Sequence, residues 1–194
     1  MQKHAKDMAI LFVVGLLSAS GPVAFAQPNP GPTPAAVFDP DANVAAILKV
    51  MEATADWALA NPAQANPSKR KPTDWTLGTF YAGTMALGGI STNQTYLDAM
   101  RRMGETNQWQ LGARKYHADD QCVGQTYAEL YFHYHNKNMI APMQERFNDI
   151  LAHPSGVPTM DFAQPDKKAQ ELWSWCDSLF MATPAWVRLC GGDG

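Results

Sequence analysis

The sequence predicts an all-α fold built from helical hairpins. Apolar residues recur at steps of three and four along most of the chain, and no stretch of useful length alternates with a period of two. Three of the periodic stretches carry charged and amide residues on one face. The three that alternate with them are rich in glycine, aromatic residues and methionine. Such alternation is typical of hairpins in which every second helix faces inward.

Residues that start or stop helices divide the chain between about 44 and 190 into six expected helices. Asp74 can cap the second, Gly88-Gly89 can end it, and Asn61-Pro62 ends the first. Pro184 removes the amide that would bond to the carbonyl of Phe180, so the sixth helix is expected to kink there. The expected spans are about 44–60, 75–87, 92–103, 119–137, 140–152 and 174–190.

The inner helices of such an array run in the same direction, so their starts should gather at one end. These are the second, fourth and sixth helices. Their starts are Asp74-Trp75-Thr76, His117-Ala118-Asp119-Asp120-Gln121 and Ser174-Trp175-Cys176-Asp177. We therefore expect three segments that are remote in sequence to form one site.

The N-terminus has the pattern of a secretory signal peptide over residues 1–26. Lys3 and Lys6 precede an apolar run over 8–17, and Ala24-Phe25-Ala26 is a small-x-small cleavage site before Gln27. We expect cleavage near Ala26-Gln27 and export, to the periplasm or outside the cell.

Beyond the cleavage site, a proline-rich tether over 27–38 is expected to precede one helical domain over 39–194. No later stretch is apolar enough to cross a bilayer, so we expect no membrane partner. A net charge of −3 and a pI near 5.9 argue against a nucleic-acid partner, because binding phosphates needs a basic surface.

Asp177 stands after two tryptophans and before an apolar helix, at Trp173-Ser174-Trp175-Cys176-Asp177. Water-poor surroundings would raise the pKa of this carboxyl group toward a working pH, and neighbouring aromatic rings suit the apolar faces of sugars. The other interpretation is a helix cap, since Ser174 and Asp177 have capping-box spacing.

Asp119 and Asp120 are adjacent, so on a helix their side chains point about 100° apart. One is expected to cap the helix and the other to face the site, and the sequence leaves open which is which. His117 is expected to support the site by hydrogen bonding. His133 and His135 are two residues apart and point to different helix faces, so we expect no metal.

Other residues near these starts have two interpretations each. Trp75 and Tyr81 could belong to the core or could form a platform for a sugar ring. Cys122 and Cys176 fall on neighbouring inner helices, so a disulfide between them is conceivable, although a small buried thiol is the commoner case.

Taken together, these segments resemble glycoside hydrolase families 88 and 105, the unsaturated glucuronyl and unsaturated rhamnogalacturonyl hydrolases. The similar stretches are 74–83, 116–127 and 172–181, and Trp175-Cys176-Asp177-Ser178-Leu179-Phe180-Met181 is the most specific of them. The resemblance implies an (α/α)6 barrel of six hairpins. Since six helices make three hairpins, the chain is expected to correspond to the N-terminal portion of that barrel, and its open edges would favour self-association.

The resemblance also implies a reaction and its residues. These families hydrate the vinyl ether of a 4,5-unsaturated uronic acid at the non-reducing end of lyase products, here expected to be pectin (rhamnogalacturonan) oligosaccharides. Asp177 would be the acid and base, and Asp119 or Asp120 the second carboxylate. No cofactor is implied. Expected substrate-binding residues are Trp75, Tyr81, His117, Gln121 and Trp175.

Two alternatives belong to other classes of function. The chain could be a catalytically inactive helical module that binds carbohydrate or a protein. It could also be another (α/α)6 glycosidase or lyase that uses two carboxylates, which would require a second essential acid at a defined separation from Asp177.

Overall fold

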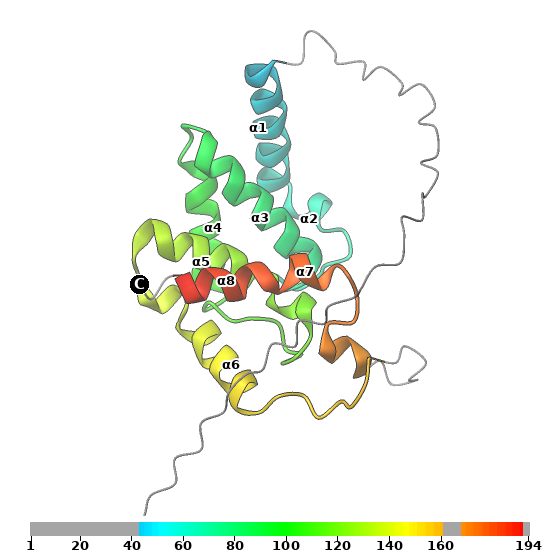
Figure 1. Ribbon diagram of the computed structural model, residues 1–194. Helices are drawn as coiled ribbons and strands as arrows, with labels where there is room; N and C mark the ends of the chain where they lie inside the picture. Colours follow the sequence, from blue (N-terminus) through cyan, green and yellow to red (C-terminus); the bar gives the residue numbers. More distant parts are fainter. Residues whose placement is uncertain (1–42, 161–167, 192–194) are drawn as a thin grey trace, which may run out of the picture. The chain divides into compact units, whose positions relative to one another are not determined.

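The computed structural model describes residues 43–160 and 168–191, and within these ranges it contains helices, turns and loops but no strand (Figure 1). The prediction of an all-α fold is therefore confirmed. In chain order, the elements are α1 (Val44–Ala60), α2 (Pro62–Ala65), α3 (Trp75–Ile90), α4 (Thr95–Thr106), η1 (Ala118–Gln121), α5 (Gly124–Tyr134), η2 (Lys137–Met139), α6 (Ala141–Ala152), η3 (Lys168–Leu172), α7 (Ser178–Met181) and α8 (Thr183–Gly191).

The predicted signal peptide over 1–26 and the tether over 27–38 lie outside the described residues. Among the helices that the structure describes, none combines the length and the apolar character that a bilayer span requires.

The core is built around α5, which packs against α3, α4 and α8. Tyr127 and Leu130 of α5 are fully buried, together with Met100 of α4 and with Met143 and Phe147 of α6. Burying one such side chain stabilises the fold by roughly 1.5–3 kcal/mol. The glycine- and aromatic-rich fourth stretch of the sequence thus supplies the central helix.

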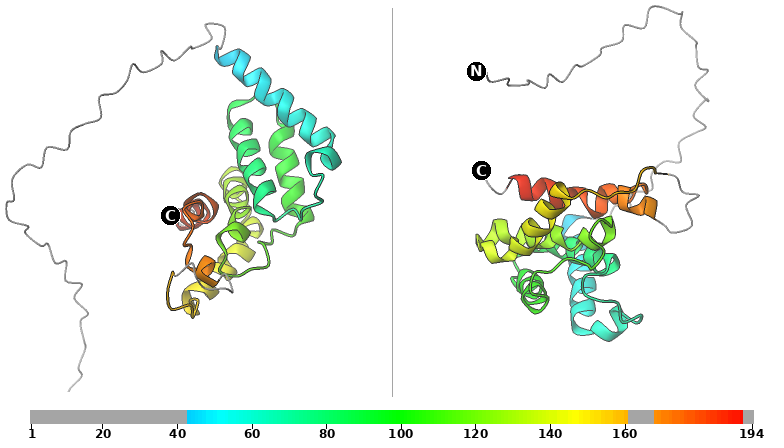
Figure 2. Two further views of the ribbon diagram at one scale, coloured as in Figure 1. Left: turned by 90° about the vertical axis from the view of Figure 1, so that its right-hand side faces the viewer. Right: turned by 90° about the horizontal axis from the view of Figure 1, so that it is seen from below.

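Helix α1 buries little of its surface against the rest of the described structure. Its one buried residue, Ala55, packs with Leu87 and Tyr96, and the hydroxyl of Tyr96 donates to Asp56 at 2.9 Å. Figure 2 shows α1 lying across the ends of α3 and α4. Much of the apolar face predicted for this helix stays exposed, including Val44 at 83%.

Helix α3 does not end at Gly88-Gly89, as the sequence predicted, but continues to Ile90. Gly88 lies against α4: a Cβ atom placed on it would be 2.6 Å from a methyl carbon of Leu97. Its lack of a side chain serves the close packing of α3 on α4, so here tertiary contact outweighs the helix-ending tendency of glycine.

The single helix predicted over 119–137 is instead the 3-10 turn η1 followed by α5. The imidazole of His117 accepts from the amide of Asp119 at 3.3 Å and caps η1. Helix α5 ends at Tyr134 because His135 adopts a left-handed conformation with φ of 54° and bonds back to Tyr131.

The sixth predicted helix is likewise divided, into α7 and α8, and residues 174–177 precede it without being helical. The break lies at Ala182, two residues before Pro184. The carbonyl of Phe180, for which Pro184 has no amide, accepts from Nε2 of Gln125 at 2.6 Å. This bond joins the break in the helix to the central helix α5.

Candidate active site

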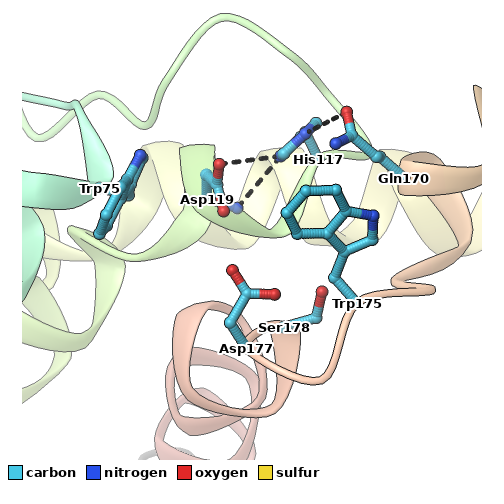
Figure 3. A pocket seen from close by; sticks show the side chains of 7 residues that line it. All are labelled: Trp75, His117, Asp119, Gln170, Trp175, Asp177 and Ser178. Atoms are coloured by element: carbon cyan, nitrogen blue, oxygen red, sulfur yellow. Dashed lines mark hydrogen bonds and ion pairs between the residues drawn. The ribbon is translucent and has the colours of Figure 1, made fainter. Parts of the chain in front are cut away.

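Three segments that are remote in sequence meet at a pocket of about 130 Å³ (Figure 3). The first is the start of α3, the second is η1, and the third is the stretch that leads into α7, with η3 closing one side. The pocket is lined by Trp75, His117, Asp119, Gln170, Trp175, Asp177 and Ser178.

The start of α3 is fixed by Asp74. Its carboxylate accepts from the amide and the hydroxyl of Thr76, at 3.0 and 2.7 Å, and pairs with Arg70 at 3.2 Å. Burial raises the pKa of Asp74, but the hydrogen bonds from Thr76 and Arg70 outweigh it and lower the pKa overall. This cap sets Trp75, the next residue, at the edge of the pocket with 40% of its surface exposed.

His117 connects two walls of the pocket. Its Nε2 lies 3.1 Å from Oε1 of Gln170, and its Nδ1 accepts from the amide of Asp119. The same Nδ1 lies 3.6 Å from Oδ2 of Asp119, a contact that becomes an ion pair when the imidazole is protonated. Gln170 was not predicted as a site residue, because it lies in a polar stretch that carries no recognisable motif.

The segment from Trp173 to Asp177 is anchored by its first residue to the loop that precedes η1. Trp173 has φ of 55°, which turns the chain away from η3, and its indole N–H donates to the carbonyl of Tyr116 at 3.0 Å. The same indole packs against the buried cluster of Ala118, Cys122, Met181 and Ala182. The anchor places Trp175 and Asp177 opposite η1 (Figure 3).

The surroundings of Asp177 differ from the sequence-based expectation. Asp177 and Trp175 are both exposed, the latter at 54%, so the predicted water-poor position is not found. No described element covers this side of the pocket, which is the physical reason for the difference. Asp177 stands directly before α7, yet its side chain forms no capping bond. Its carboxylate points toward that of Asp119 (Figure 3).

Asp119 is the carboxyl group of this pocket whose pKa is shifted. Burial raises it most, and the negative charges of Asp177 and Asp120 raise it as well. His117 and Arg114 act in the opposite direction, and the net pKa is above the ordinary value. The pocket therefore holds two facing carboxyl groups in unequal surroundings.

Asp120 does not line this pocket. Its buried carboxylate accepts from Nε and Nη2 of Arg114, at 2.9 and 2.6 Å, and from the amide of Arg114 at 2.6 Å. Between the two candidates that the sequence left open, the structure puts Asp119 at the pocket and Asp120 behind it.

Two predicted substrate-binding residues also lie elsewhere. Tyr81 is buried in the core beside a separate apolar cavity, and burial raises its pKa to about 12. Gln121 is fully buried, where its amide donates to the carbonyl of Lys115 and accepts from the indole of Trp186. Tyr81 thus has the core position that was one of its two interpretations. Gln121 points inward because η1 is a 3-10 turn and not the first turn of a longer α-helix.

The conceivable disulfide between Cys122 and Cys176 is not formed. All three cysteines are free; Cys122 is buried and Cys176 is exposed. Among the described residues, no group of three or more His, Cys, Asp or Glu side chains is arranged to hold a metal ion.

Comparison of the sequence with known proteins identifies its family. Residues 50–191 match Glycosyl Hydrolase Family 88. The chain belongs to this family. The all-helical structure is consistent with part of an α/α toroid.

The chain is also similar to two curated proteins, each named unsaturated 3S-rhamnoglycuronyl hydrolase. With that of Formosa agariphila it is 31% identical over 146 residues, which are 72% of this chain and 35% of the relative. With that of Alteromonas sp. (strain LOR) it is 26% identical over 157 residues, which are 73% of this chain and 38% of the relative. The chain thus spans little more than a third of the length of either relative.

Proposed function

We propose that this protein is a glycoside hydrolase that releases 4,5-unsaturated uronic acid from the non-reducing end of lyase-generated oligosaccharides. The observation that carries the proposal is the pair of carboxyl groups, Asp119 and Asp177, that face each other in a pocket between Trp75 and Trp175. Membership of Glycosyl Hydrolase Family 88 supports the general reaction class.

In this proposal the reaction is hydration of a vinyl ether. Protonated Asp177 donates its proton to C4 of the unsaturated ring, and positive charge develops at C5 and the ring oxygen. Water then adds to C5, and the ionised Asp177 takes a proton from that water, which restores the acid. The product is a hemiketal that opens and releases the sugar. One carboxyl group thus acts as both acid and base.

Asp119 has the second role in this scheme. When ionised, it favours the positive charge near C5 and accepts hydrogen bonds from sugar hydroxyls. Trp75 and Trp175 offer apolar ring faces to the pyranose from two sides of the pocket. His117 and Gln170 supply polar edges for the hydroxyl groups.

The leaving sugar is proposed to be rhamnose. The names of the two relatives specify a rhamnoglycuronyl unit, and the rhamnogalacturonan oligosaccharides proposed here also contain rhamnose. Parallel assays with unsaturated oligosaccharides that carry rhamnose and with others that carry a different leaving sugar test this part separately.

The experiment is an ultraviolet assay. The unsaturated uronide loses its absorbance when the double bond is hydrated, so the protein should bleach lyase-digested rhamnogalacturonan. Asp177→Asn should reduce the rate by about 10²–10⁴-fold, which is the usual range for loss of a general acid. Asp98→Asn, on the outer face of α4, is the matched control and should keep the rate. Full activity of Asp177→Asn would overturn the assignment of the acid.

A carbohydrate-binding module without turnover is the second candidate. The exposure of Asp177 and Trp175 favours it, since an open pocket binds a sugar more readily than it excludes water. Calorimetric titration that detects oligosaccharide binding, together with an unchanged absorbance, would select this candidate.

A further inference from the structure

Arg114 lies beside Asp119 and Asp120 without lining the pocket. Its Nη2 stands 3.6 Å from Oδ2 of Asp119 and 2.6 Å from Oδ1 of Asp120. More than half of the Arg114 side chain is exposed, so packing alone does not hold it. What holds it is Asp120, whose two oxygens accept from Nε, Nη2 and the backbone amide of Arg114.

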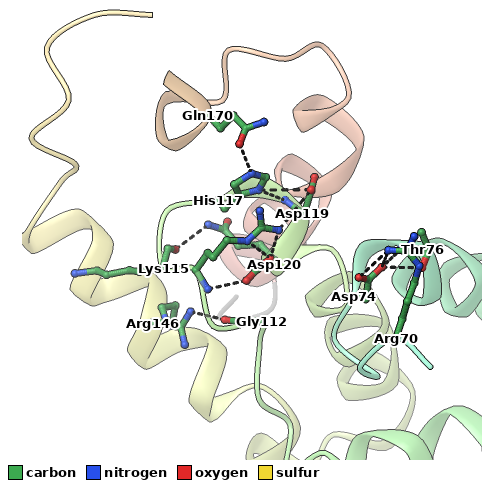
Figure 4. Close-up of polar contacts among 12 residues, drawn as sticks. Arg70, Asp74, Thr76, Gly112, Lys115, His117, Asp119, Asp120, Arg146 and Gln170 are labelled. Atoms are coloured by element: carbon green, nitrogen blue, oxygen red, sulfur yellow. Dashed lines mark hydrogen bonds and ion pairs between the residues drawn. The ribbon is translucent and has the colours of Figure 1, made fainter. Parts of the chain in front are cut away.

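Asp120 is itself fixed from behind. Its carbonyl accepts from the amide of Gly112 at 2.7 Å, and Arg146 of α6 donates to the carbonyl of Gly112 at 3.0 Å (Figure 4). A Cβ atom on Gly112 would lie 2.5 Å from Cβ and Cγ of Asp120, so this approach requires glycine. The loop before η1 is thereby locked to α6 and to the carboxylate that holds Arg114.

We propose that Arg114 is a positioning residue: clamped by Asp120, it keeps a positive charge beside Asp119 and thereby favours the ionised form of that carboxyl group. This inference rests on the proposed function. It assigns different tasks to the two adjacent aspartates, one toward the substrate and the other toward Arg114.

The charges around Asp119 explain why a nearby cation matters for its ionisation. Arg114 and His117 favour its ionised form, whereas burial and the carboxylates of Asp177 and Asp120 oppose it. The thiol of Cys122 also faces it, but burial and Asp119 raise the pKa of that thiol to about 12, so it stays neutral.

Other charged groups also lie near η1. Lys168 and Glu171 of η3 line a second pocket together with Arg114 and His117, and Lys115 pairs with Asp149. At the start of α3, Asp74 and Arg70 pair with each other. Residue 176, on the way into α7, is an uncharged cysteine, and Gln170 of η3 is neutral. Of the two cationic groups that act on Asp119, Arg114 stays positive at every working pH, whereas His117 is positive only when it is protonated.

The experiment is a pH titration of the Asp119 carboxyl group by carbon NMR in the full chain without substrate. Arg114→Gln should raise the pKa of Asp119, and Arg114→Lys, which keeps the charge but not the fork, should raise it less. Arg101→Gln, which removes an arginine from a pair of acids on α4, is the control and should leave it unchanged. An unchanged Asp119 titration in Arg114→Gln would overturn the proposal.

Kinetics supply the second readout. In Arg114→Gln, the acidic limb of the kcat/KM profile should move to higher pH while the alkaline limb stays in place. A uniform loss at every pH would indicate a merely structural role and would contradict the proposal. The NMR arm needs no turnover, so a protein without hydrolase activity would disprove the proposed function and still leave the role of Arg114 measurable.

Discussion

The pKa of Asp119 is subject to opposing influences, so the effect of this residue on the stability of the fold depends on pH. Burial and the nearby carboxylates raise its pKa, and the opposing charges of His117 and Arg114 do not fully offset them. A carboxyl group whose pKa is raised on folding binds its proton more tightly in the folded chain. Its ionised form therefore destabilises the fold at neutral pH, and this cost disappears as the pH falls through the folded pKa toward the ordinary value of 3.8.

Replacing this group should consequently stabilise the protein. Asp119→Asn should raise the free energy of unfolding at pH 7, and the gain should shrink as the pH falls toward 4. Urea unfolding followed by circular dichroism at several pH values measures this. Asp98→Asn, which removes an exposed partner of Arg101, is the control and should change stability by no more than about 0.5 kcal/mol. Loss of stability in Asp119→Asn at pH 7 would contradict the account.

At the residue scale, the sequence identified most of the pocket. Trp75, His117, Asp119, Trp175 and Asp177 were all predicted as site residues, and all line it. They were found because each stands at the start of an expected inner helix. Their chemical roles remain predictions.

The other candidate residues lie elsewhere for two reasons. Asp120 and Gln121 stand next to a helix start in sequence, but the direction of their side chains depends on the register of the turn. Tyr81 takes the core position that the sequence had left open. The 3-10 geometry of η1 was not predictable from periodicity. Gln170 was missed because its role depends on a contact with His117, 53 positions earlier.

At the scale of elements, tertiary contacts decide where helices begin and end. Glycine pairs and proline gave the sequence-based boundaries. Helix α3 nevertheless passes through Gly88-Gly89, whereas the last helix breaks at Ala182, between Phe180 and Pro184, where the proline predicted a kink. In both cases a neighbour accounts for the outcome: Leu97 packs on Gly88, and Gln125 takes the free carbonyl beside the break. The glycine and proline residues located the helix boundaries to within a few residues. They could not identify the tertiary contacts that decide the exact position of each boundary.

The two adjacent glycines give a test of how α3 packs on α4. Gly88→Ala should cost about 1–3 kcal/mol, because its methyl group would overlap Leu97 of α4. Gly89→Ala meets open space inside the same helix and should stabilise the protein by about 0.5–1 kcal/mol. Thermal and urea unfolding of both variants provide the comparison. Equal effects at the two positions would show that α3 does not pack on α4 in this way.

At the scale of the whole molecule, the fold class followed from hydrophobic periodicity, whereas the extent of packing did not. The inner, glycine-rich stretches became α3, α5 and the α7–α8 pair, and the central position of α5 matches the expectation of a dry inner helix. The exposed apolar face of α1 was not foreseen, because periodicity identifies a face but not the element that covers it.

The joint site of Trp75 and Trp175 can be tested through the tryptophan indole signals. Asp177→Asn protein with nitrogen-labelled tryptophan is titrated with unsaturated rhamnogalacturonan oligosaccharides, so that substrate binds without turnover. We predict that the signals of Trp75 and Trp175, 100 residues apart, shift along one saturation curve, while those of Trp109 and Trp186 in the core region stay in place. Movement of only one of the pocket indoles, or of Trp57 beside the separate apolar cavity, would contradict the account.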